Sequence, residues 1–352
     1  MKEKVLVAMS GGVDSSVAAY LLQSAGYDVS GLTLKLSDST SEDIINLAAL
    51  TAKAIGAPHY VLDLSDVFKK RVMEYFAKAY LKGLTPNPCV ECNRYIKFEE
   101  VLKFAAEKGI YKVSTGHYAQ IEHDNETDRY LLKKARDPSK DQSYFLYVLN
   151  QRILKDTLFP LGSYSKDEVR KIASNAGFNN SDRKDSQDVC FLPNGSYSDF
   201  VMSFAGAEIE NEGNFIDQNG KVLGRHSGIH KYTIGQRKGL GISLGKPAFV
   251  VSKNIFDNTV TLADEESLYS DRLAASQINL ISYDSLEQPM RLKVKTRYSQ
   301  KEEWAKVFQI EEDKVIVEFD NPQRAITSGQ SAVFYEDEYV VGGGIIIDGK
   351  IY

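Results

Sequence analysis

The sequence has no long hydrophobic run and no excess of positive charge. No stretch of about 18 apolar residues occurs in the 352-residue chain, and the first residues form a charged segment rather than a signal peptide. We therefore expect a cytoplasmic protein with no membrane partner. The formal net charge is −5, so the surface as a whole does not attract nucleic acid, and an RNA partner requires a local basic patch.

Cysteine is scarce as well, and its three copies are Cys89, Cys92 and Cys190. An odd and small number excludes a disulfide scaffold, which leaves reactive thiols or metal ligands as the expected roles. A cysteine becomes a strong nucleophile when nearby cations or a helix N-terminus lower its pKa. The cations close to the cysteines in sequence are Arg94, Lys97 and Lys184. We expect these cations to activate the thiols.

The two commonest nucleotide-binding loops, G-x-x-x-x-G-K-S/T and G-x-G-x-x-G, are also missing. Residues 4–25 read KVLVAMSGGVDSSVAAYLLQSA, which predicts an apolar strand, a Ser-Gly-Gly-Val-Asp-Ser loop and a helix. Gly11 and Gly12 allow backbone N–H groups to close around an anion at the positive end of that helix. The stretch therefore predicts a phosphate-binding site.

Strands and helices alternate in the first part of the chain. Strands are expected at residues 28–36 and 59–64, with helices at 41–56, 66–82 and 97–108. This alternation predicts an α/β fold with a doubly wound parallel sheet, whose ligands bind at the carboxyl ends of the strands. Because Pro86 and Pro88 disfavour helix, residues 84–93 are expected to form a stiff loop that carries the C-x-x-C pair.

The composition changes near residue 205. Glycine becomes frequent in residues 206–270, which predicts a small β-rich domain, and short alternating strands from residue 278 onward predict an antiparallel barrel. We predict three domains, at 1–205, 206–275 and 276–352. A period of two places Arg291, Lys293, Lys295 and Arg297 on one strand face, where they either contact nucleic acid or are simply solvated. Residues 118–134 are expected to form a hairpin.

Several longer motifs run along nearly the whole chain in a fixed order. They are SGGVDS, TPNPxVxCNxxIKF, TGHYA, DPxKDQSYFL, LFPLG, KxDSxxVCF, YTIGQRKGLG and RxxxxGQxAVFY. This set resembles the bacterial tRNA-specific 2-thiouridylases of the PP-loop ATP pyrophosphatase superfamily. The resemblance implies a PP-loop catalytic domain of the adenine nucleotide alpha hydrolase type, a small linking domain and a C-terminal β-barrel. It also implies thiolation of C2 of the wobble uridine in the tRNAs for Lys, Glu and Gln.

The resemblance also assigns residues to ligands. ATP with Mg²⁺ is expected at Ala8, Met9, Ser10, Gly11, Gly12, Val13, Asp14, Ser15, Leu34 and Gly116. The tRNA is expected at Asn87, Pro88, Cys89, His117, Lys140, Asp141, Gln142, Arg297, Tyr298 and Gln330, with the target uridine near the first three. The expected catalytic residues are Asp14, the nucleophile Cys92 and the persulfide carrier Cys190.

The implied chemistry couples ATP cleavage to sulfur transfer. Uridine O2 attacks the α-phosphorus of ATP, pyrophosphate leaves, and a persulfide on Cys190 delivers sulfur to C2. Cys92 either releases sulfide from the persulfide or resolves the carrier as a transient disulfide. The sulfur donor is expected to be a persulfide carrier protein or sulfide.

Cys89 departs from the family pattern, which usually has Asp at this position. Three thiols at one site are the ligand set of a [4Fe–4S] cluster with one open iron, which offers an alternative sulfur route through bound sulfide. A third hypothesis is that Cys89 and Cys92 form a redox-active C-x-x-C pair. The loop at residues 37–41 is also shorter than the acidic insert usual in the family.

Two other classes of function remain open from the sequence. A PP-loop ligase or amidotransferase acting on a small molecule needs no thiols. An RNA-binding module with a dead ATP site is disfavoured because Asp14 and both serines of the loop are intact.

Overall fold

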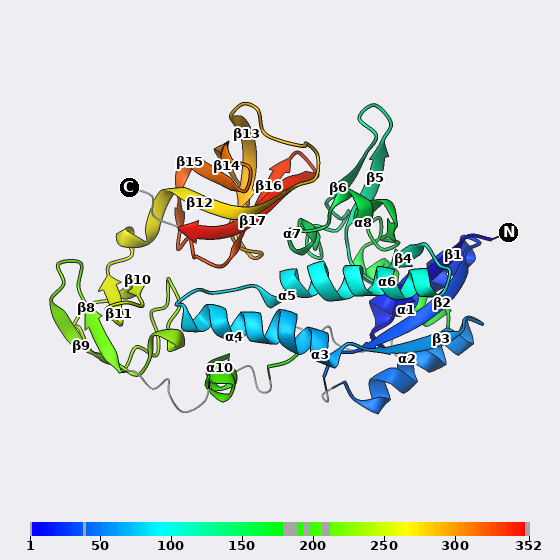
Figure 1. The fold of residues 1–352 in the computed structure, drawn as a ribbon, viewed down its shortest axis with the longest axis horizontal. Helices are drawn as coiled ribbons and strands as arrows, with labels where there is room; N and C mark the ends of the chain where they lie inside the picture. Colours follow the sequence, from blue (N-terminus) through cyan, green and yellow to red (C-terminus); the bar gives the residue numbers. More distant parts are fainter. Residues whose placement is uncertain (1, 38–39, 179–188, 193–196, 206–211, 349–352) are drawn as a thin grey trace.

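The computed structural model describes residues 2–37, 40–178, 189–192, 197–205 and 212–348. Figure 1 shows an α/β part on the right, a small β-rich part on the left and a barrel at the top. Long helices cross the molecule between the α/β part and the β-rich part (Figure 1). The predicted fold class is therefore confirmed. Among the described residues, no helix is long and apolar enough to cross a membrane.

The α/β part is built on a parallel five-stranded sheet of order β3-β2-β1-β4-β7. Its strands are β1 (Lys4–Ala8), β2 (Asp28–Lys35), β3 (His59–Asp63), β4 (Lys112–Ser114) and β7 (Thr157–Leu158). The chain leaves β1 toward β2 and β3 and later returns to the other side of β1 as β4. This reversal is the switch point at which ligands bind in such sheets. The loops after β1 and β4 both lie there.

The apolar run of β1 explains its central position, because Val5, Leu6 and Val7 are fully buried. The helices of this part are α1 (Val13–Ser24), α2 (Glu42–Ala54), α7 (Ser143–Leu146), α8 (Gln151–Lys155) and α9 (Lys166–Asn175). Helices α1 and α9 share one hydrophobic core, to which they contribute Val17 and Val169. The starts of both helices are thereby fixed close to the same loop.

The long central helices correct one prediction, since the C-x-x-C pair lies in a helix and not in a loop. One helical run comprises α3 (Ser65–Phe68), a π-helix at Lys69–Met73 and α4 (Glu74–Leu81); the other comprises α5 (Pro88–Glu91), a π-helix at Cys92–Glu100 and α6 (Val101–Glu107). Pro88 occupies the first helical position, where a missing N–H costs nothing. Asn87 caps this end by accepting from the Cys89 N–H at 3.1 Å.

The β-rich part follows α10 (Tyr197–Ala205) and has the strand order β10-β11-β8-β9. Its strands are β8 (Gly213–Ile216), β9 (Val222–His226), β10 (Phe249–Asn254) and β11 (Thr259–Ala263), with short 3-10 helices at Ile229–Lys231 and Glu266–Leu268. Phe215, Val250 and Val260 are fully buried in its core. The expected small β-rich unit is therefore present.

The barrel is closed by pairing of β12 with both β15 and β17. Its strands are β12 (Tyr269–Leu280), β13 (Met290–Lys295), β14 (Glu303–Glu311), β15 (Lys314–Arg324), β16 (Ser331–Glu336) and β17 (Tyr339–Asp348). Strand β12 crosses the domain boundary predicted at residue 276.

The predicted hairpin is present as β5 (Gln120–Asp124) and β6 (Arg129–Lys133). Strand β6 also pairs with β17 of the barrel, with Leu132 opposite Val340. Lys134 then forms an ion pair with Glu302 at 2.7 Å. The hairpin thus attaches the barrel to the α/β part, a contact that sequence patterns did not predict.

Candidate functional site

The predicted phosphate loop connects β1 to α1. Gly11 has φ +69°, in the left-handed region that glycine adopts without strain. Ser10 N–H donates to Ser15 Oγ at 3.1 Å, and Ser15 Oγ donates to the Gly12 carbonyl at 3.2 Å. Among the described residues no side chain caps α1 at Gly12, and a helix start of this kind is suited to binding an anion.

The remaining predicted ATP residues surround this loop. Ala8 ends β1, Met9 and Val13 are buried, and Leu34 lies half-buried in the neighbouring strand β2. The Met9 carbonyl accepts from Thr33 Oγ1 at 3.0 Å, which fixes the loop to β2.

Asp14 is the only charged residue of the loop, and two residues from other segments bind its carboxylate. Tyr118 donates to Oδ1 at 2.8 Å, and Lys166 Nζ lies 2.8 Å from both carboxylate oxygens. Lys166 is only 6% exposed. Sequence reasoning missed Lys166, although the capping pattern of Ser165 and Glu168 marked the start of α9 at this point.

The four residues Thr115–Tyr118 after β4 connect the phosphate loop to the rest of the site. Gly116 packs directly on the loop, Tyr118 binds Asp14, and the Tyr118 N–H donates to Gln142 Oε1 at 3.0 Å. His117 is buried and stacks on Phe98 with ring centroids 5.9 Å apart. Burial lowers the pKa of His117 well below its usual value, and Lys97 lowers it further.

Replacing Gly116 by Ala is expected to weaken ATP binding about tenfold or more. The added Cβ lies 2.8 Å from Ser15 N and 2.9 Å from Asp14 C, so backbone of the phosphate loop must move. Calorimetric titration with ATP measures the effect. Gly177→Ala is the control for destabilisation alone, because its φ of +73° strains an alanine while the added Cβ meets no atom within 4 Å, and because it is remote in sequence from the loop. Unchanged ATP affinity in Gly116→Ala contradicts the assignment.

The three cysteines lie within electrostatic range of one another. Cys92 is buried, whereas Cys89 and Cys190 are exposed. Burial is the main reason that the pKa of Cys92 is raised to about 12; Lys97 lowers this pKa, and Cys190 and Cys89 contribute to the rise. The pKa of Cys190 is also raised, because the protein around the exposed sulfur still removes part of its water.

These pKa directions correct the expectation that cations activate the thiols. Lys97 does lower the pKa of Cys92 and Cys190, but the loss of water has the larger effect. Arg94 is instead coupled to the buried Glu91. Lys184 lies outside the described residues. At neutral pH both Cys92 and Cys190 are therefore protonated thiols.

An aromatic cluster holds the chain next to Cys190. The ring of Phe191 lies 5.7 Å from Phe68, 5.4 Å from Phe76 and 5.0 Å from Phe200. Phe191 and Cys92 belong to the same hydrophobic core. This packing keeps Cys190 beside the helix that carries Cys92.

The predicted tRNA residues come together where the cysteine helix meets the barrel. Gln330 donates to the Thr85 carbonyl at 2.7 Å, just before Asn87. Tyr298 is 38% exposed and its ring lies 4.5 Å from Phe145. Lys140 and Asp141 act electrostatically on Tyr298, which places them at the same surface.

Arg297 is the exception among these residues, because its guanidinium is partly used inside the protein. It donates to Thr327 Oγ1 at 2.5 Å and to the Ala325 carbonyl at 3.0 Å. The other three cations predicted on the same strand face lie next to aromatic rings: Arg291 and Lys293 lie over Trp304, and Lys295 lies over Tyr298. Leu292 and Val294 point into the barrel, as the period of two predicts.

Comparison with known proteins adds the family. A sequence model described as the tRNA methyl transferase HUP domain matches residues 3–194, a PRC-barrel domain of the same series matches 198–264, and an aminomethyltransferase beta-barrel domain matches 270–346. The tRNA-specific 2-thiouridylase MnmA of Clostridioides difficile is 48% identical over 358 residues, covering 98% of each chain. That of Thermoanaerobacter pseudethanolicus is 50% identical over 355 residues, covering 97% of each chain. The chain belongs to the tRNA-specific 2-thiouridylase family.

In this member of the 2-thiouridylase family, the described side chains around the thiols do not form a preformed metal-binding site. Among the residues that the structure describes, no three His, Cys, Asp or Glu side chains lie where they can share a metal ion. Cys92 is buried while Cys89 and Cys190 face outward.

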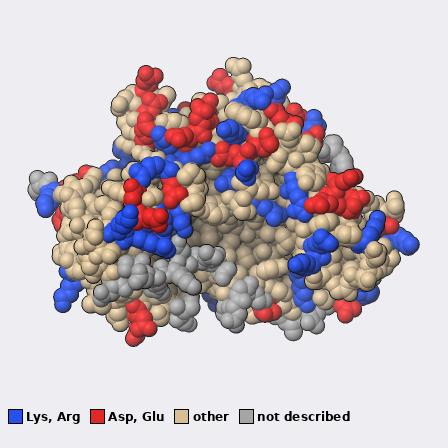
Figure 2. Space-filling model, turned by 180° about the vertical axis from the view of Figure 1, so that it is seen from behind, with Lys and Arg blue, Asp and Glu red and all other residues tan. Residues whose placement is uncertain are grey.

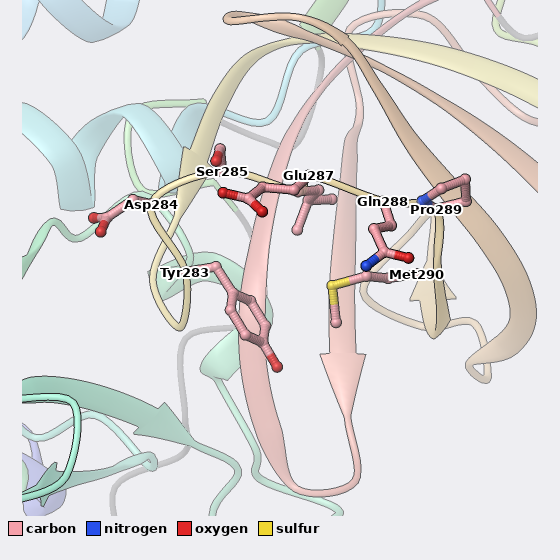
Figure 3. A pocket seen from close by; sticks show the side chains of 8 residues that line it. Tyr283, Asp284, Ser285, Glu287, Gln288, Pro289 and Met290 are labelled. Carbon is pink, nitrogen blue, oxygen red and sulfur yellow. The ribbon is translucent and has the colours of Figure 1, made fainter.

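Two surface features of the chain lie outside the predicted site. An open pocket is lined by residues 283–289 of the β12–β13 loop and by Met290 at the start of β13, none of which is a predicted site residue (Figure 3). The face seen in Figure 2 carries separate groups of Lys and Arg next to Asp and Glu rather than one continuous basic surface. On this face a polyanion would meet separate groups of cations rather than a continuous basic surface.

Proposed function

We propose that this chain is an ATP-dependent tRNA-uridine 2-sulfurtransferase that replaces O2 of the wobble uridine by sulfur and forms AMP and pyrophosphate. One observation carries the proposal. The segment Thr115–Tyr118 contacts the phosphate loop through Gly116 and Tyr118, and it also presents His117 near Lys97, which acts on Cys92 and Cys190. ATP and sulfur chemistry thus share one site.

The first step activates the uridine. ATP binds at the start of α1, uridine O2 attacks the α-phosphorus, and the bond to the bridging oxygen of pyrophosphate breaks. The partly exposed carboxylate of Asp14 suits Mg²⁺, which proteins usually hold through one or two carboxylates together with substrate phosphates. Mg²⁺ at this place neutralises charge on the phosphates.

The second step transfers sulfur. The exposed Cys190 thiol takes the terminal sulfur of an outside persulfide, whose S–S bond breaks and whose thiol leaves, so that Cys190 carries the persulfide. The terminal sulfur then forms a bond to C2 while AMP leaves with the former O2 atom. The Cys92 thiolate then attacks the Cys190 sulfur, which breaks the S–S bond, completes the thiouridine and leaves a Cys92–Cys190 disulfide. A dithiol reductant of the cytoplasm returns both thiols with two electrons.

The tRNA lies over the junction of the cysteine helix and the barrel. Asn87, Pro88 and Cys89 face the target uridine, and Lys140 to Gln142, Tyr298 and Gln330 hold the surrounding loop. Tyr298 and Phe145 offer rings on which an unstacked base can pack. The tRNAs are those for Lys, Glu and Gln.

The family description mentions methyl transfer, but the site favours thiolation. Methyl transfer needs neither an ATP loop nor a set of three thiols, and this chain has both at one place. The test is the dependence of AMP and pyrophosphate formation on unmodified tRNA. We expect formation only with tRNA. Formation without tRNA supports a small-molecule ligase instead, and absence of ATP binding supports an RNA-binding module.

Replacing Cys89 by Ala is expected to leave thiolation within about threefold of the unchanged protein, because the persulfide route uses only Cys92 and Cys190. The assay is single-turnover formation of 2-thiouridine by anaerobically purified protein, with iron and sulfide measured on the same sample. Cys190→Ala serves as the inactive reference. Loss of activity in Cys89→Ala together with bound iron in the unchanged protein contradicts the persulfide route and favours the cluster.

A further inference from the structure

The phosphate loop carries a net negative charge although its expected ligand is also negatively charged. Its residues Ser10–Ser15 include no Lys or Arg, and Asp14 gives the loop a negative charge. A triphosphate brings several more negative charges to the same place. Loop amides and a helix start supply only partial positive charges, equivalent to about half an elementary charge. Apart from a bound Mg²⁺, a full positive charge can reach the phosphates only from a side chain of another segment.

Lys166 supplies a full positive charge at this place. Its Nζ lies 2.8 Å from both oxygens of Asp14, although 152 positions separate the two residues. It also lies 5.9 Å from the ring centroid of Tyr118. Lysines are seldom this deeply buried, at 6% exposure, unless a partner or a function holds them.

The position of Lys166 in its helix gives no structural reason for a lysine. It is the first residue of α9, where the helix dipole disfavours a positive charge. The helix start is already satisfied, because Ser165 and Glu168 form a capping box and the Lys166 N–H donates to Asp137 Oδ2 at 3.2 Å. These contacts fix the backbone of Lys166 and leave its side chain directed at Asp14.

We propose that Lys166 is the phosphate-binding cation of the ATP loop and stabilises the leaving pyrophosphate. This role rests on the proposed function. With ATP bound, Asp14 would hold Mg²⁺ through its carboxylate, and the Lys166 ammonium next to it binds the β- and γ-phosphates. As uridine O2 bonds to the α-phosphorus and the bond to the bridging oxygen breaks, the ammonium balances the charge that develops on pyrophosphate.

The competing explanation is an ion pair that only stabilises the fold. In that case loss of Lys166 lowers the melting temperature but leaves pyrophosphate affinity unchanged. A phosphate-binding cation gives the opposite result for affinity. Pyrophosphate binding, measured by calorimetry in EDTA without tRNA, therefore separates the two explanations without relying on turnover.

The variants are Lys166→Met, Lys166→Gln and Lys166→Arg. Lys171→Met is the matched control, because Lys171 is an exposed cation on the same helix. We expect Lys166→Met and Lys166→Gln to weaken pyrophosphate binding at least tenfold and to slow pyrophosphate release with tRNA about 10²- to 10³-fold. Lys166→Arg, which keeps the charge, is expected to recover most of the affinity, and Lys171→Met to match the unchanged protein.

Two results overturn the proposal. The first is unchanged pyrophosphate affinity in both neutral variants. Lys166→Gln is included because its amide can still donate a hydrogen bond to Asp14, so this variant remains testable if Lys166→Met does not fold. The second is failure of Lys166→Arg to exceed the neutral variants. Failure of the proposed function gives a different result, because the unchanged protein then releases no pyrophosphate from ATP in the presence of tRNA. The pyrophosphate-binding assay still measures the effect of Lys166 in that case.

Discussion

Replacing Cys190 by Ser abolishes 2-thiouridine formation, with an expected loss of about 10³-fold or more, while adenylation of the tRNA continues. Serine has nearly the same size but cannot carry a sulfane sulfur. The phosphate loop and Asp14 do not involve Cys190, so pyrophosphate is still released once per bound tRNA. Mass spectrometry of nucleosides from digested tRNA, with pyrophosphate measured in parallel, checks both halves of this prediction.

The Cys92→Ser variant distinguishes the role of Cys92 from that of the persulfide carrier Cys190. It is expected to lose free product to a similar extent but to accumulate tRNA joined to Cys190 through the S–S bond, because Cys92 is no longer there to break that bond. Cys89→Ala is the control with a normal yield. Thiouridine formation by Cys190→Ser at more than a few per cent of the normal rate contradicts the carrier role.

The raised pKa values give this reaction a pH dependence. Both thiols are protonated at pH 7, since burial raises the pKa of Cys190 above its usual value and that of Cys92 to about 12. The thiolate fraction of such a group rises about tenfold per pH unit below its pKa. Where sulfur transfer limits turnover, the rate therefore rises from pH 7 to pH 9.

Replacing Asp14 by Asn is expected to slow adenylation about 10²- to 10³-fold. The change removes the carboxylate that suits Mg²⁺ and leaves the buried Lys166 without its charged partner. An unpaired buried group also costs about 1 to 3 kcal/mol of the free energy of unfolding. Pyrophosphate release and urea denaturation measure the two effects.

Asp167→Asn is the matched control for Asp14→Asn, because Asp167 is an exposed carboxylate beside Lys166 in the first turn of α9. It is expected to change neither the adenylation rate nor the free energy of unfolding by much. Normal pyrophosphate release by Asp14→Asn contradicts its place in the ATP site.

Local features of this protein could be predicted from the sequence. The loop Ser10–Ser15 follows from six neighbouring residues, and the hairpin and the barrel strands follow from a period of two and turn residues. The C-x-x-C helix was missed because Pro86 and Pro88 suggested a loop, whereas proline is acceptable at the first position of a helix capped by Asn87.

Contacts between distant segments could not be predicted. The pairing of β6 with β17 and the ion pair of Asp14 with Lys166 join residues that are far apart in sequence. The pKa of Cys92 depends on burial, which only tertiary packing sets, so nearby cations in the sequence gave the wrong direction.

The central claim is that ATP activation and sulfur transfer from Cys190 occur on one tRNA uridine. The most direct test is a single turnover with protein carrying a ³⁴S-labelled persulfide on Cys190, ATP and unmodified tRNA. We expect one ³⁴S-labelled 2-thiouridine at the wobble position for each AMP formed. AMP formation without labelled thiouridine, or thiouridine that contains only unlabelled sulfur, contradicts it.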